Sequence, residues 1–95
     1  MAQVSDEVRA EVVVSYRKLL EAVSRAILLA SDAVAVSDLT VLFAQKRTEL
    51  QAIEAGQAIS SRDAAKALYT NYVAVDVFSE ADEINESYVN AASVI

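Results

Sequence analysis

Apolar residues recur along the first third of the chain with the alternating three- and four-residue spacing of a helix face. They occupy positions 13, 16, 20, 23, 27, 30 and 34, as Val, Tyr, Leu, Val, Ile, Ala and Val. This spacing is the seam of a heptad pattern, in which one helix face packs against a partner helix. Ser5 precedes two acidic residues, as an N-cap precedes the first turn of a helix. The pattern predicts a helix over residues 6–33.

The C-terminal end of this predicted helix is apolar on more than one side. Leu28 and Leu29 lie off the seam, and a helix that is apolar all round is buried on several sides. We therefore expect this end to lie deep in a bundle or at a contact between subunits. The predicted packing and oligomer seam consists of Val13, Tyr16, Leu20, Val23, Ile27, Leu28, Leu29 and Val34.

Residues 26–44 form a largely apolar segment whose only charges are Asp32 and Asp38. Each aspartate would cost about 2.5–3.5 kcal/mol at the centre of a bilayer, so we expect no membrane span. The pairs Ser31-Asp32 and Ser37-Asp38 are instead typical of helix starts. Two helices meeting at a turn are favoured, and a short β excursion at AVAV and TVLF is the alternative.

The rest of the chain predicts further helices. One spans 38–55, with Ser37 or Asp38 as its N-cap and Gly56 as its stop, and Lys46 interrupts its apolar row. A third spans 61–78 and a fourth 80–93, and these two can be continuous. Residues 71–78 (NYVAVDVF) are β-rich by propensity, so a strand is the alternative there.

Composition favours the same fold class. The chain has no proline and one glycine, whereas a β-sandwich or barrel of 95 residues needs several tight turns. Apolar residues make up 55%, more than one small core can hide. The sequence predicts an all-α protein, a single domain over 1–95. Its architecture is a three- to four-helix bundle or a long helical hairpin that forms a homo-oligomer.

The chain has no cysteine and no histidine, which excludes thiolate or imidazole metal sites and Ser-His or Cys-His nucleophiles. We expect no cofactor, no metal and no catalytic activity. The net charge is −6, and all eight basic residues lie at or before Lys66, so nucleic-acid binding is not expected. The C-terminal third carries an acidic face that could dock a basic partner or remain solvated: Asp76, Glu80, Asp82, Glu83 and Glu86.

These features predict a structural subunit whose partners are further copies of itself and other proteins of one assembly, for example a phage particle or a secretion apparatus. A small acidic regulator that binds a basic surface through residues 76–86 is the alternative. A third hypothesis is an enzyme of the all-helical chorismate-mutase format, using Arg17, Lys18, Arg25, Lys46 and Arg47.

The five residues from Tyr72 to Asp76 are similar to the Y-x-x-x-D export signal of type VII secretion substrates, which are also short helical proteins. Those proteins carry a Trp-x-Gly turn between two helices, whereas this chain has no tryptophan. The segment MAQVSDEVRAE is acidic and lacks an apolar run, so we expect no secretory signal. The expected location is therefore the cytoplasm or the interior of an assembly such as a virion.

Overall fold

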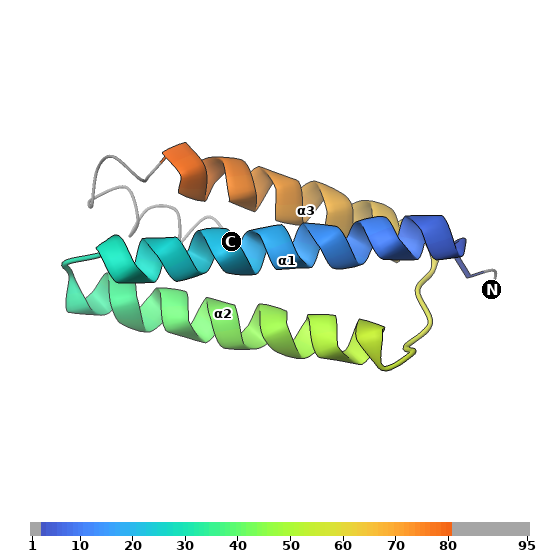
Figure 1. Ribbon diagram of the computed structural model, residues 1–95, viewed down its shortest axis with the longest axis horizontal. Helices are drawn as coiled ribbons and strands as arrows, with labels where there is room; N and C mark the ends of the chain where they lie inside the picture. The colour runs from blue at the N-terminus through green and yellow to red at the C-terminus, as the bar shows by residue number, and fades with distance from the viewer. Residues whose placement is uncertain (1–2, 81–95) are drawn as a thin grey trace.

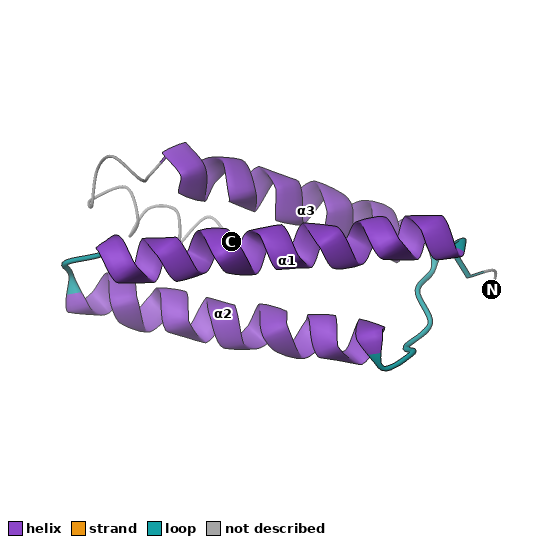
Figure 2. Ribbon diagram, viewed as in Figure 1, coloured by secondary structure: helices purple, strands orange, loops and turns teal. Residues whose placement is uncertain are grey.

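The computed structural model describes residues 3–80, and this part of the chain is helical, as Figures 1 and 2 show. The helices are α1 (Asp6–Leu29), α2 (Ala33–Glu54) and α3 (Ser61–Glu80). Within residues 3–80 there is no strand, only an isolated bridge between Gln3 and Ser60. The predicted all-α class is confirmed. The predicted helix over 80–93 lies almost wholly outside the described residues.

Helix α1 begins where the sequence predicts. The Ser5 side chain accepts a hydrogen bond from the Val8 amide, at 3.2 Å, which confirms it as the N-cap. The helix ends at Leu29, four residues before the predicted end. It ends there because Ala30 is extended and the chain turns directly into the cap of the next helix.

Helix α2 begins at Ala33, so the prediction of a start at residue 38 with Ser37 or Asp38 as its cap is wrong. The cap is Asp32, whose Oδ1 accepts from the Val34 and Ala35 amides at 2.7 and 3.2 Å. Ser37 and Asp38 are exposed and lie within the helix. Both Ser-Asp pairs resemble caps in sequence, and only the first sits at a helix start. The β excursion considered for residues 26–44 is therefore also wrong.

Gly56 ends α2 as predicted. It has φ of 108°, a conformation that residues with a Cβ adopt only with strain. The Gln57 amide donates to the Ala52 carbonyl and the Gly56 amide to the Ile53 carbonyl, which is the hydrogen-bond pattern of a Schellman motif. The chain then crosses to α3, whose first turn is capped by Ser60 accepting from the Asp63 amide at 3.1 Å.

Helix α3 continues through residues 71–78, so the strand alternative for NYVAVDVF is wrong. The β-branched residues of this segment are tolerated because Ala74 and Phe78 are buried against the other helices. Packing thus outweighs the local β propensity.

Helix α1 lies between the other two, as Figure 1 shows, and it packs against both. Contacts between α2 and α3 are sparse by comparison. Two buried clusters lie along α1. The turn-end cluster, near the α1–α2 turn, includes Leu19, Val23, Leu39 and Phe78. The loop-end cluster, near residues 55–60, includes Val12, Tyr16, Leu50, Ile53 and Ile59. None of the helices described here is both long and apolar enough to cross a membrane.

Candidate functional site

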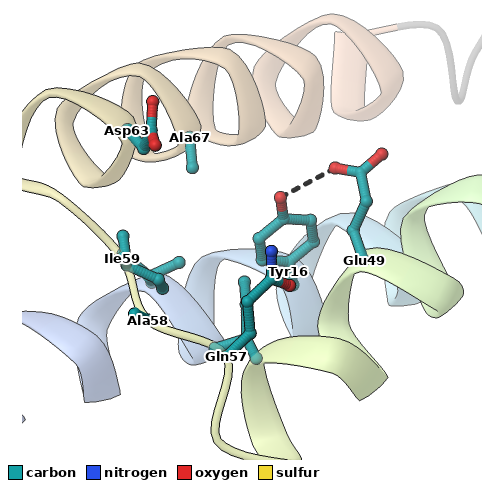
Figure 3. Close-up of a pocket in the computed structure, with 9 residues that line it drawn as sticks. Tyr16, Glu49, Gln57, Ala58, Ile59, Asp63 and Ala67 are labelled. Atoms are coloured by element: carbon teal, nitrogen blue, oxygen red, sulfur yellow. Dashed lines mark hydrogen bonds between the residues drawn. The ribbon is translucent and has the colours of Figure 1, made fainter.

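A groove runs between α2 and α3 over the side chain of Tyr16, at the end of the molecule that holds the loop-end cluster. It consists of two adjoining hollows of about 210 and 240 Å³ that share Tyr16, Glu49, Asp63 and Ala67. Figure 3 shows Asp63 and Ala67 on α3 and Glu49 on α2, with the Glu49 carboxylate directed toward the Tyr16 hydroxyl. The groove exists because α2 and α3 both pack on α1 and touch each other little.

Tyr16 and Glu49 form the central polar contact of this groove. The Tyr16 hydroxyl donates to Glu49 Oε1 at 2.8 Å, as the dashed line in Figure 3 marks. Burial raises the pKa of Tyr16 above its ordinary value, and the hydrogen bond to Glu49 and the Glu49 charge raise it further. A hydrogen bond from Asn71 acts in the opposite direction but does not outweigh them. The phenol therefore stays protonated at neutral pH and serves as a hydrogen-bond donor rather than as a base.

Asn71 and Ser15 form a second polar contact, which is fully buried. Asn71 Nδ2 donates to Ser15 Oγ at 3.0 Å, and Ser15 Oγ donates to the Val12 carbonyl at 2.6 Å. Asn71 Oδ1 has no hydrogen-bond partner among the described residues. A buried acceptor without a partner lowers the stability of the folded protein by about 1–3 kcal/mol. A molecule that donates a hydrogen bond to this oxygen would remove that cost, which favours its binding.

Lys46 lines the α2 side of the same groove. Its side chain is only 14% exposed, although its ammonium is charged. The Nζ atom lies 3.7 Å from Glu49 Oε1 and 6.0 Å from the centre of the Tyr16 ring. An ammonium has three N–H donors, and a carboxylate at that distance does not saturate them. Lys46 therefore retains donor capacity inside the groove.

The predicted seam of α1 divides into three environments. Tyr16 and Val23 are buried, and Val13, Leu20 and Ile27 are half-buried. The remaining three are exposed: Leu28 at 82%, Leu29 at 51% and Val34 at 62%. The face that α1 buries is centred on Val12, Leu19 and Ala26, the residues that flank the predicted seam. The face of α1 that is buried is therefore rotated about the helix axis from the predicted seam, by about the angle between adjacent residues.

The basic residues proposed for an enzyme engage different parts of the molecule. Arg17 pairs with Glu54 of α2 at 2.7 Å, whereas Lys18 lies 5.9 Å from the centre of the Tyr72 ring on α3. Arg47 lies over the Phe43 ring. Of the five basic residues, Lys46 is the one that lines the groove.

The predicted acidic face falls largely outside the described residues. Asp76 is exposed on α3 and Glu80 is the last residue of that helix. Asp82, Glu83 and Glu86 lie beyond residue 80, so docking through this face stays a prediction. Within residues 3–80, no group of acidic residues is placed to hold a metal ion.

Sequence reasoning did not identify Ser15, Glu49 and Asn71 as members of one site. The available signal was weak: Lys46 interrupts an apolar row, and Ser15 and Asn71 are polar residues next to apolar ones. No family model, curated protein or solved structure matches this chain.

Proposed function

We propose that this protein is a structural subunit that associates with further copies of itself. The contact would form through the apolar turn, defined here as Leu28, Leu29 and Val34. The supporting observation is that Leu28 is 82% exposed at the end of α1, beside two further exposed apolar residues. The role within a larger assembly, such as a phage particle or a secretion apparatus, is part of the same proposal.

The energetics favour covering this turn. Fully burying a leucine or valine side chain is worth about 1.5–3 kcal/mol, so three neighbouring exposed apolar residues give a substantial gain on association. Isolated surface leucines are common, whereas apolar side chains grouped at one end of a molecule are typical of an interaction site.

The local charges permit a second copy of the chain to cover the apolar turn. The one ionisable group within the turn is Asp32, and its carboxylate is engaged by the amides at the start of α2. Apposition of two identical turns therefore brings together apolar side chains while each Asp32 carboxylate stays hydrogen-bonded to the start of its own α2. A symmetric contact between identical surfaces is the commonest form of oligomer.

The test compares three glutamate substitutions in the full chain. Leu28→Glu should reduce the oligomeric mass measured by light scattering and native mass spectrometry, with helical content unchanged. Val14→Glu is the matched control, because Val14 is 44% exposed on α1 away from the turn, and its oligomer should persist. Leu20→Glu should instead lower stability, since Leu20 packs against the loop-end cluster. A wild-type chain that stays monomeric at high micromolar concentration contradicts the proposal.

A further inference from the structure

Two polar side chains that line the groove, one from each of its sides, have unused hydrogen-bonding capacity. Lys46 is a mostly buried cation with spare donors, and Asn71 Oδ1 is a buried acceptor without a partner among the described residues. Both residues line the hollow of about 240 Å³. They come from α2 and α3, so the arrangement arises from the packing of both helices on α1.

The two groups require opposite chemistry from a ligand. The Lys46 ammonium is satisfied by an anion, and a carboxylate accepts charge-assisted hydrogen bonds from it. Asn71 Oδ1 is satisfied by an N–H or O–H donor. Asp63 and Glu49 line both hollows, and Lys66 lines the same hollow as Lys46. A molecule that carries a carboxylate and a nearby amino or hydroxyl group meets both requirements.

The adjoining hollow has a mixed lining, in which apolar side chains lie beside the carboxylates of Glu49 and Asp63. It has a volume of about 210 Å³, and Val12, Ile53 and Ile59 are among the residues that line it. Ile53 and Ile59 belong to the loop-end cluster and are largely buried. A short aliphatic group can lie against Val12, Ile53 and Ile59, whereas a ligand carboxylate in this hollow would be repelled by Glu49 and Asp63.

We propose that the groove binds a compact aliphatic carboxylic acid with an amino or hydroxyl donor on the carbon next to the carboxylate. The carboxylate contacts Lys46, the donor serves Asn71 Oδ1, and the aliphatic group lies against Ile53 and Ile59. Asn71 is fully buried, so the donor reaches it after a side-chain adjustment of the groove wall, a change common on binding. This site is separate from the apolar turn and does not rest on self-association.

The test titrates the full ¹⁵N-labelled chain with four probes that share one branched aliphatic group, and binding is followed by NMR and calorimetry. L-Leucine carries the amino donor and 2-hydroxy-4-methylpentanoate the hydroxyl donor. 4-Methylpentanoate lacks the donor, and 3-methylbutylamine lacks the carboxylate. We expect at least one of the first two to bind, roughly tenfold or more tightly than either truncated probe. The better of the two identifies the donor.

Substitutions of single residues test whether the acid binds in the groove. Lys46→Met keeps the aliphatic stem and should weaken binding of the preferred acid roughly tenfold or more. Asn71→Leu should bring its affinity to that of 4-methylpentanoate. Arg47→Gln is the control, because Arg47 is exposed and lies over Phe43, and it should bind as the wild type does. Circular dichroism verifies that each variant folds, and the probe series tests the wild type independently of them.

Three results would overturn the proposal. One is the absence of any shift with all four probes at millimolar concentration. Another is equal affinity for the complete and truncated acids, which would indicate apolar binding alone. The third is a crystal structure with an ordered water on Asn71 Oδ1 together with no acid binding, which would make the site a hydrated polar layer.

Discussion

At the scale of single residues, polar contacts join α1 to both of its neighbours. Ser15 bonds Asn71 of α3, and Tyr16 bonds Glu49 of α2. Apolar packing tolerates small slips of one helix along another, whereas a hydrogen bond holds only over a narrow range of distances. These two adjacent residues of α1 therefore favour one register for both partner helices.

The Tyr16 contact predicts a pH-dependent effect on stability. Tyr16→Phe removes the donor to Glu49 and should lower the free energy of unfolding by about 0.5–1.5 kcal/mol near neutral pH. In the wild type the folded-state pKa of Tyr16 is raised, chiefly by burial. Its stabilising contribution is therefore complete below pH ~10, the unfolded value, and is lost as the pH rises through the folded value.

Urea unfolding of both proteins between about pH 8 and pH 11 measures this effect. The stability difference between wild type and Tyr16→Phe should narrow as the pH rises, because phenylalanine cannot ionise. A difference that is constant across this range would show that the hydroxyl is not held in its protonated form by the fold.

At the scale of elements, the caps explain where the helices begin and end. Ser5, Asp32 and Ser60 each accept from amides in the first turn of a helix, and Gly56 supplies the positive φ that ends α2. Amides at a helix start have no partner within the helix, so such caps lower the free energy of the folded chain.

Because Asp32 caps α2 and Asp38 does not, alanine substitutions at the two positions should have different effects on stability. Asp32→Ala should lower the free energy of unfolding by about 0.5–2 kcal/mol, because two amides lose their acceptor and the helix start loses a favourable charge. Asp38→Ala is the matched control and should change stability by about 0.5 kcal/mol or less, since Asp38 is exposed within the helix. Denaturant titration distinguishes the two. Equal effects, or a larger effect at Asp38, would contradict the assignment of Asp32 as the N-cap of α2.

At the scale of the whole molecule, α1 carries most of the tertiary packing. It contacts both α2 and α3 along its length, and the molecule is elongated, with extents of 44 × 20 × 17 Å. The side chains of α1 that are buried against the other two helices supply much of the core, so stability depends strongly on them.

Leu19 is the central example. It is fully buried in the turn-end cluster, so Leu19→Ala should destabilise the fold by about 2–5 kcal/mol through lost burial and the cavity left behind. Val41→Ala removes an apolar side chain of α2 that is exposed, and it should cost about 0.5 kcal/mol or less. Thermal and denaturant unfolding measure both. Similar losses at the two positions would contradict the central role of α1.

The sequence by itself determined the helical fold class and several boundaries of the helices. The scarcity of glycine and proline, the Ser5 cap and the Gly56 stop act through neighbours in the chain, so they are visible without a structure. The choice between Ser31-Asp32 and Ser37-Asp38 was not visible, because both pairs satisfy the same local rule. It depended on where α1 ended and α2 could begin to pack.

Only the tertiary structure decided which residues form the groove and which apolar residues remain exposed. Ser15 and Asn71 are 56 positions apart, so no spacing in the sequence relates them. Their contact depends on the rotation of each helix about its axis, which the summed packing of Leu19, Phe78 and their neighbours sets. The same rotation turns Leu28 outward although it resembles a core residue in sequence. Periodicity indicates that a helix has an apolar face, whereas the partner helices determine which side of that face is buried.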